Sequence, residues 1–532
     1  MKIERGIIFF IPVFLAVFSG CSGKYLEKSA DRQVHEIIEE KKASMQDDVL
    51  PETSLAHISD SVSSETIRLE LKDAIILASK NNRTYKSNRE SVYLNILDLT
   101  YQRYLFGNRY GLGGDVSWSK NGDENISGGL GFNLIRWLST GAQITFDIAK
   151  DFVRYLTGDA DTDIGTIVAM NILQPLLKGA GREIAQEDLI QAERDAVYGI
   201  RSFLRYRKNF SIDTTEKFLQ ILLTKNRTDN YYNNYNSLKI TRERIEMLAE
   251  AGRLPPFQVD QARQNEYAAY QRWINAQNSY VSALDNFKIF LGIPMESVVS
   301  PDETLLERLV EAGITEPDID VNEFIGNAVK KRLDLLTDYD RVEDSKRQIK
   351  IALNNLKPRV DLIMNVTAST DEEDHPTVDF RNFSYRAGVE FDLPLSKLPE
   401  RNSYKRALIS LNSAQRNFEN KRDTVILDVF QQSRNLEEYY QSYVIQKNSL
   451  LLAGKRIEST DLLLQAGRAT TRDLLDAEES YLSAKNDLAS AVVNYIVSYL
   501  KFLYSSEYLE VDDEGMWKGE LYENITKENT EK

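Results

Sequence analysis

Cysteine and histidine are the scarcest residue types in this chain of 532 residues. Cys21 is the only cysteine, which excludes a disulfide framework and a cysteine-based metal site. The three histidines, His35, His57 and His375, are scattered and show no ligand spacing. We therefore expect no metal site.

An excess of positive charge is also missing, since the formal net charge is −15. Binding of nucleic acid requires basic patches, so no nucleic-acid partner is expected. The sequence has no phosphate-cradling loop, no nucleophile elbow and no dinucleotide fingerprint, and the glycines at 128–131 lack a following helix. These absences predict no catalytic residues and no cofactor, and the protein is not expected to be an enzyme.

One apolar run stands at the N-terminus, from Ile7 to Phe18, and Ser19-Gly20-Cys21 closes it. Its length suits a signal peptide and is short for a membrane-spanning helix. Small residues before a lone cysteine resemble the lipobox of bacterial lipoproteins, which implies a signal peptide over 1–20 and lipidation of Cys21. The alternative is cleavage without lipidation. Ser22 stands where aspartate usually retains lipoproteins in the inner membrane, so the resemblance favours the outer membrane.

A seven-residue repeat of small residues occurs twice. Its members are Ala262, Ala269, Ala276 and Ala283, and then Ala477, Ala484, Ala491 and Ser498. A strict heptad repeat imposes a left-handed supercoil and requires a partner helix. An ordinary globular helix rarely holds this phase for about four heptads. The pattern predicts an internal duplication built on long coiled helices.

The duplication suggests an order of segments along the chain. A tether without clear period, but with some helix, is expected over 21–64. The first copy, 65–294, has a helix, about four strands within 111–174 and a long hairpin over 185–291. A linker at 295–319 leads to the second copy, 320–508, with a helix, strands within 358–394 and a hairpin over 401–504. The acidic tail, 509–532, is expected to be poorly ordered.

The strand stretches are marked by alternation, as where Leu130, Phe132 and Leu134 alternate with Gly131 and Asn133. This period suits strands that are half buried or face lipid. Strands of about ten residues suit a membrane, whereas polar long helices suit water. The extra strand pair near 126–150 either widens the sheet or folds outside it.

The second hairpin carries the most specific pattern. Asp473 follows Gly467 by six positions, and Leu475-Asp476-Ala477 and Asn494-Tyr495 come next. Further matching stretches are Gly252 with Gln261-Ala262-Arg263 and Gln174-Pro175-Leu176-Leu177. In order and spacing, residues 66 to 504 resemble the TolC family of outer-membrane efflux proteins.

The resemblance implies an α+β membrane protein that forms a homotrimer. Strands of three subunits would close a β-barrel in outer-membrane lipid, and the helices would form an α-barrel across the periplasm of a Gram-negative-type bacterium. The implied function is a passive efflux tunnel that docks with a periplasmic adaptor and an inner-membrane transporter. The alternative is a non-conducting, periplasm-spanning structural lipoprotein. The exported substrate is not indicated.

The resemblance also implies functional residues. Asp473 and Asp476 fall at the family's gate positions, and in a trimer they would form two rings of carboxylates. The alternative is that both merely complement the helix dipole. The expected adaptor-docking tips are Gly252, Arg253, Leu254, Gly467, Arg468 and Leu474. Gln258 and Ala469 replace residues that usually help to latch the gate, which implies a weaker latch.

Overall fold

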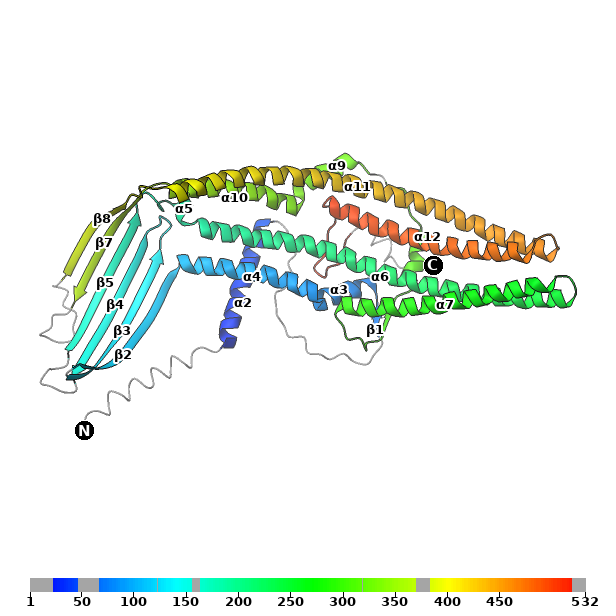
Figure 1. Cartoon of the computed structure of the whole chain (residues 1–532), viewed down its shortest axis with the longest axis horizontal. Coiled ribbons are helices and arrows are strands. Elements are labelled where there is room, and N and C mark those ends of the chain that lie inside the picture. Colours follow the sequence, from blue (N-terminus) through cyan, green and yellow to red (C-terminus); the bar gives the residue numbers. More distant parts are fainter. Residues whose placement is uncertain are drawn as a thin grey trace, which may run out of the picture. The chain divides into compact units, whose positions relative to one another are not determined.

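The computed structural model describes residues 23–45, 67–121, 123–155, 163–317, 319–369 and 383–518. The chain divides into two compact units. We call Met1–Asp47, Ser91–Ile200 and Thr337–Glu419 the sheet unit, and Asp48–Glu90, Arg201–Leu336 and Asn420–Lys532 the hairpin unit. Figure 1 traces the elements in chain order. The predicted signal peptide and Cys21 lie outside the described residues.

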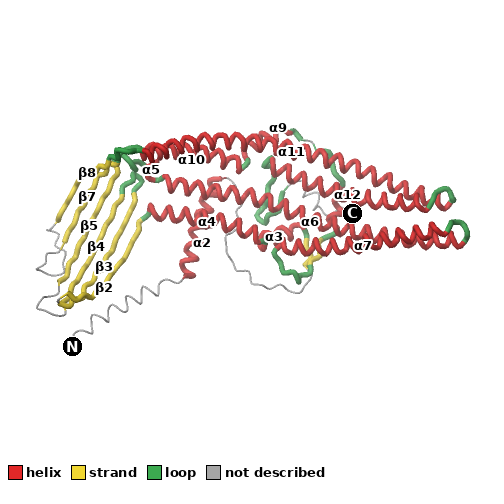
Figure 2. The backbone as a smooth tube through the Cα atoms, in the orientation of Figure 1, coloured by secondary structure: helices red, strands yellow, loops and turns green. Residues whose placement is uncertain are grey.

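The sheet unit contains one six-stranded antiparallel sheet, drawn in yellow in Figure 2. Its order is β2-β3-β4-β5-β7-β8. The strands are β2 (Asn108–Asn121), β3 (Asp123–Trp137), β4 (Gln143–Tyr155), β5 (Asp163–Pro175), β7 (Arg359–Ser369) and β8 (Phe383–Asp392). The four strands expected within 111–174 and the two expected within 358–394 are thus confirmed. β3 and β4, the extra pair, are inner strands of the sheet and do not fold outside it.

The register of the sheet separates an apolar face from a polar one. Residues directly opposite one another on neighbouring strands share a face, and successive residues alternate between faces. One such row runs through Tyr110, Leu134, Phe146, Met170, Val366 and Tyr385. The adjacent row, on the other face, runs through Gly111, Asn133, Asp147, Ala169, Thr367 and Ser384. The sheet therefore presents hydrocarbon on one side and hydrogen-bonding groups on the other.

The helix in the expected tether is long and packed. α2 (Gly23–Met45) buries Val34, Ile37 and Ile38. Its partner is α4 (Arg83–Phe106), in which the Tyr93 hydroxyl donates to Asp31 Oδ1 at 2.8 Å. Arg103 of α4 also donates to both carboxylate oxygens of Glu40, at 3.0 and 3.1 Å. Val34, Ile37 and Ile38 are spaced three and four residues apart, which is the pattern of an amphipathic helix.

The remaining helices associated with the sheet unit are short α5 (Arg182–Ala185) and α10 (Leu333–Asn355). Arg347 of α10 donates to the carboxylate of Glu187 at 3.1 Å and to Gln191 Oε1 at 2.9 Å. Glu187 and Gln191 belong to the start of α6 (Glu187–Glu250), so charged and amide groups join α10 to α6 across a partly buried contact.

The long hairpins predicted over 185–291 and 401–504 are confirmed. α6 (Glu187–Glu250) precedes α7 (Pro256–Leu291), and α11 (Leu398–Gln465) precedes α12 (Thr471–Ser505). α6 has 64 residues and α11 has 68, so each is roughly 100 Å long. The hairpin unit also holds β1 (Ile67–Leu69), which pairs in parallel with β6 (Val299–Pro301), and helices α3 (Leu71–Asn81), α8 (Thr304–Ala312) and α9 (Val321–Lys331).

The small residues of the two heptad repeats differ in how far they are buried. In α12 all four small residues are buried, whereas in α7 only Ala262 and Ala269 are. Small residues let neighbouring helices approach closely. In α12 this close packing extends over all four heptad positions. Phe502 of α12 is fully buried and packs against Phe324 with ring centroids 4.7 Å apart.

The C-terminal residues were wrongly expected to be poorly ordered from position 509 onward. Leu509, Met516 and Trp517 are each at most 2% exposed. The Trp517 indole Nε1 donates to Thr215 Oγ1 at 3.2 Å, and Val511 forms a β-bridge with Trp517. Three apolar side chains among acidic neighbours are enough to anchor this segment as far as residue 518. The later residues of the predicted tail lie outside the described ranges.

Candidate gate and docking tips

Both hairpins turn on a glycine in the left-handed region. Gly252 has φ 72° and Gly467 has φ 71°. The residue after each glycine donates its amide to a carbonyl five positions back: Arg253 N to Leu248 O at 2.9 Å, and Arg468 N to Leu463 O at 2.8 Å. A Cβ on either glycine would meet no atom within 4 Å. Backbone conformation, not crowding, is therefore what requires glycine here.

The helices after the two turns begin differently. α7 starts with Pro256, whose missing amide proton costs nothing in the first turn. α12 starts after Thr470 with a capping box: Asp473 N donates to Thr470 Oγ1 at 3.3 Å, and Thr470 N donates to Asp473 Oδ2 at 2.8 Å. The pattern of threonine followed three residues later by an acidic residue signals such a box. This capping box was not among the features predicted from the sequence.

The first proposed gate residue, Asp473, takes part in this cap with its whole carboxylate exposed to solvent. Hydrogen bonds from the hydroxyl and the amide of Thr470 lower the pKa of Asp473. Hydrogen bonds to an ionised carboxylate favour the charged form. Asp473 is therefore held ionised and aimed back at the N-terminus of its own helix.

The second proposed gate residue, Asp476, lies one turn further along α12 and is also exposed. Arg472 Nε is 3.8 Å from its Oδ2, a loose ion pair between exposed groups. The structure thus brings Asp473 and Asp476 to one helical turn with both carboxylates accessible. Their assignment to a gate stays a prediction, because a gate needs several copies of the chain.

A neutral hydrogen bond joins the two hairpin tips within one chain. Thr471 Oγ1, at the first residue of α12, donates to Gln258 Oε1, in the first turn of α7, at 2.8 Å. Thr471 is fully buried, so water does not compete freely for this bond. Gln258 is one of the two positions where the resemblance led us to expect an altered latch, and its altered side chain still joins the hairpins.

The expected docking residues divide by exposure. Arg253 and Arg468 are exposed, and neither forms an ion pair with a described residue. Leu254 is half-buried. Leu474 is only 1% exposed, so its side chain packs within the chain and its assignment to a docking surface was wrong. Phe257, 65% exposed beside the first tip, is an apolar surface residue that the sequence analysis did not select.

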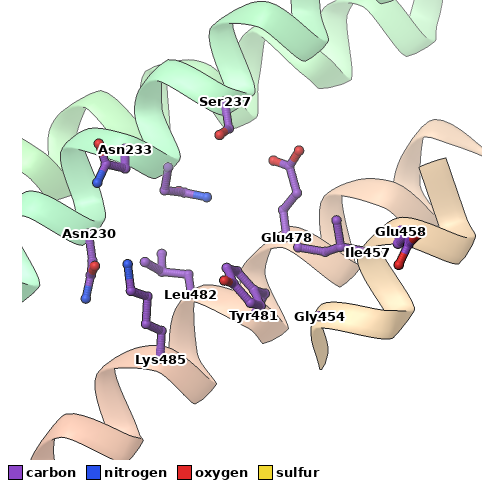
Figure 3. Close-up of a pocket in the computed structure, with 11 residues that line it drawn as sticks. Asn230, Asn233, Ser237, Gly454, Ile457, Glu458, Glu478, Tyr481, Leu482 and Lys485 are labelled. Carbon is purple, nitrogen blue, oxygen red and sulfur yellow. The ribbon is translucent and has the colours of Figure 1, made fainter. Parts of the chain in front are cut away.

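A polar cavity lies further along the same hairpins, between α6, α11 and α12 (Figure 3). Its volume is about 400 Å³. The polar side chains that line it include Asn230, Asn234 and Ser237 from α6, Glu458 from α11, and Glu478 and Lys485 from α12. Figure 3 shows the Glu478 carboxylate pointing toward the side of the cavity where Ser237 lies.

The carboxyl group of Glu478 is the least satisfied group in this cavity. Thr241 Oγ1 donates to its Oε1 at 3.3 Å, while Oε2 is buried without a hydrogen-bond partner among the described residues. Burial raises the pKa of Glu478 to about 7, and the hydrogen bond from Thr241 and the charge of Arg244 offset this only in part. Asn234 Oδ1 is a second buried acceptor without a described partner. Neither feature could be read from the sequence, because both depend on which helices surround them.

No helix within the described ranges combines the length and the apolarity needed to cross a bilayer. Within the same ranges, no group of three or more histidine, cysteine, aspartate or glutamate side chains is placed to hold a metal ion.

The fold is shared with solved structures of outer-membrane channels. The chain is 14% identical to the outer membrane protein VceC of Vibrio cholerae, with a TM-score of 0.60 over 82% of this chain and 95% of that one. The Campylobacter jejuni CmeC outer membrane channel is 12% identical, with a TM-score of 0.60 over 86% and 89%. The open state of the Neisseria gonorrhoeae MtrE outer membrane channel is 12% identical, with a TM-score of 0.59 over 88% and 96%. At these identities the likeness establishes the fold.

The second half of the chain also resembles a known family in sequence. Residues 324–500 match the model of the outer membrane efflux protein family. The comparison with curated proteins finds no match. The chain thus shares its fold with these solved channels, and its residues 324–500 are similar to the outer membrane efflux protein family.

Proposed function

We propose that three copies of this chain form one continuous efflux tunnel. In this arrangement the sheets of the three copies close a β-barrel in the outer membrane. The long hairpins surround the tunnel on its periplasmic side. The tunnel is passive, because it relies on partner proteins for energy.

The observation that carries this proposal is the two-faced sheet. Its rows alternate between an apolar face, as at Leu134 and Phe146, and a polar face, as at Asn133 and Asp147. Lipid on one side and water on the other is the environment in which such a sheet is stable. A bilayer also leaves no water for unpaired backbone groups, so the sheet has to close with other copies.

The hairpin tips are proposed to dock with a periplasmic adaptor, which in turn couples to an inner-membrane transporter. Arg253 and Arg468 support this part, because each is an exposed cation beside a rigid glycine turn. The two similar turns also support the proposed internal duplication. Asp473 and Asp476 are proposed to narrow the tunnel near the second tip, and Cys21 is proposed to carry the lipid anchor.

Two measurements test the tunnel. Native mass spectrometry of the detergent-extracted protein should give the mass of three copies, and a dimer or monomer would contradict the proposal. Reconstitution into planar bilayers should then give discrete conductance steps. Trimers without conductance under any condition, including chelation of divalent cations, would favour the structural lipoprotein instead.

A further inference from the structure

The two edge strands of the sheet, β2 and β8, each have one side without a partner. Among the described residues no strand pairs with the outer side of either. β2 has 14 residues and β8 has 10, so each edge presents a long row of backbone donors and acceptors. Within a bilayer each unpaired group costs several kcal/mol. Membrane insertion therefore requires a partner for both edges.

The directions of the strands make each edge a suitable partner for the other. All neighbours in the sheet are antiparallel and the strands number six, so β2 and β8 run in opposite directions. Pairing β8 of one copy with β2 of the next would continue the antiparallel pattern without a break. Bacterial single-chain barrels have an even number of antiparallel strands for the same reason.

The side chains of the two edges match as well. On the apolar face, β2 carries Leu112 and Trp118, 68% and 62% exposed. The same face of β8 carries Tyr385 and Phe391, 86% and 77% exposed. Pairing the edges would thus extend one apolar belt across the junction between copies.

A single copy cannot close on itself, because membrane barrels have at least about eight strands. We infer that β8 of each copy pairs with β2 of the next, so that three copies of six strands close an eighteen-stranded barrel with β3 and β4 in its wall. This inference rests on the proposed trimer and specifies the width of its membrane pore.

The pore would be wide. With strands about 4.8 Å apart and tilted by about 40°, eighteen strands give a barrel about 36 Å across between backbones. Side chains leave a lumen of roughly 25 Å. The polar face carries glycine at several positions, including Gly111, Gly113, Gly129 and Gly131, which adds to the free space. The barrel would therefore pass bulky solutes, up to small folded polypeptides, and would not itself be the size filter.

Cryo-electron microscopy of the full chain in lipid nanodiscs tests the inference directly. We expect three copies and eighteen wall strands, with β2 and β8 of neighbouring copies in contact. Three copies with a narrower wall that leaves β3 and β4 outside would overturn the inference while the proposed tunnel stands. Any other number of copies would overturn both.

A deletion provides a functional test in planar bilayers. Removing residues 122–162 takes out β3 and β4 and joins β2 to β5, leaving four strands per copy, or twelve in a trimer. Polyethylene glycols of graded size, added on the side of the β-strand loops, report which polymers enter the barrel. The largest polymer that enters the deletion variant should have about half the diameter of the largest one that enters the full chain. The reason is that twelve strands leave a lumen of roughly 14 Å.

The matched control is deletion of residues 371–379, between β7 and β8, which leaves six strands per copy and should leave the polymer cut-off unchanged. An equal cut-off for the full chain and for the 122–162 deletion would show that β3 and β4 do not widen the pore. Should the deletion variant fail to assemble, the strand count by microscopy still decides.

Discussion

Asp473 has two possible tasks, as a helix cap and as a gate carboxylate, and the structure shows how to separate them. Its hydrogen bonds with Thr470 complete a capping box. Replacing a capping residue costs about 0.5–2 kcal/mol. A variant of Asp473 therefore loses helix stability even if the carboxylate has no role in ion conduction.

The first prediction concerns ion selectivity. Asp473→Ala combined with Asp476→Ala should abolish block by multivalent cations and weaken cation selectivity, because the tunnel loses both proposed rings of carboxylates. Single-channel recording measures both effects. Thr470→Ala is the matched control: it removes the cap but keeps both carboxylates, so it should destabilise α12 and retain the block. If the double variant is blocked as strongly as the parent, the two aspartates serve only the helix.

The second prediction concerns pH. Burial raises the pKa of Glu478 to about 7 from the ordinary glutamate value of 4.5, so the folded protein binds this proton more tightly than the unfolded chain. The resulting stability is fully present below about pH 4.5 and is lost as pH rises through about 7. Glu478→Gln mimics the protonated group at every pH.

Thermal unfolding of Glu478→Gln should match the parent near pH 4.5 and show higher stability at pH 8, by at most on the order of 3 kcal/mol. Glu438→Gln, at an exposed position on α11 with no ion pair among the described residues, controls for loss of one negative charge. If Glu478→Gln is no more stable than the parent at pH 8, this carboxyl group is hydrated in the assembled protein.

At the scale of the elements, each hairpin turns on a glycine with positive φ. Gly252→Ala and Gly467→Ala should each lower the free energy of unfolding by about 1–2 kcal/mol, because a non-glycine residue is strained at positive φ. Chemical denaturation measures the loss. Gly326→Ala in α9 is the control, since it lies in a helix, meets no atom within 4 Å and should be neutral or stabilising. Equal effects at all three sites would argue against strain as the cause.

The fourth prediction concerns docking of these same turns. Arg253→Glu with Arg468→Glu should strongly reduce crosslinking to a co-expressed adaptor, because both exposed cations at the tips are reversed. Arg422→Glu, at an exposed arginine in the middle of α11, should leave crosslinking unchanged. Undiminished crosslinking in the double variant would place the adaptor contact elsewhere.

At the scale of the whole molecule, attachment to the membrane has two sources, the proposed barrel and the proposed lipid. Cys21→Ser should abolish labelling by a palmitate analogue and impair sorting to the outer membrane more than insertion of the sheet. Stable anchoring by lipid alone needs two signals or more, so the barrel is expected to hold the protein once it has arrived. Label that persists in Cys21→Ser would rule out this cysteine as the acceptor.

Local periodicity explains what the sequence alone predicted of this protein. The heptads of α7 and α12, the glycines at 252 and 467, and the alternation along β3 each depend on neighbours within a few residues or on helical spacing. They indicated long hairpins, their turns and a two-faced sheet before any contact between distant segments was known. The family pattern around Asp473 and Asp476 suggested the proposed function.

Tertiary structure decided what depends on distant segments. Only strand pairing shows that β3 and β4 belong inside the sheet, since the same alternation fits a separate hairpin. Only packing shows that Leu474 is buried, that Trp517 anchors the C-terminal segment and that Glu478 lies in a cavity between three helices. Burial and register are set by residues far apart in the sequence, whereas helix caps and periodicity are set by residues close together.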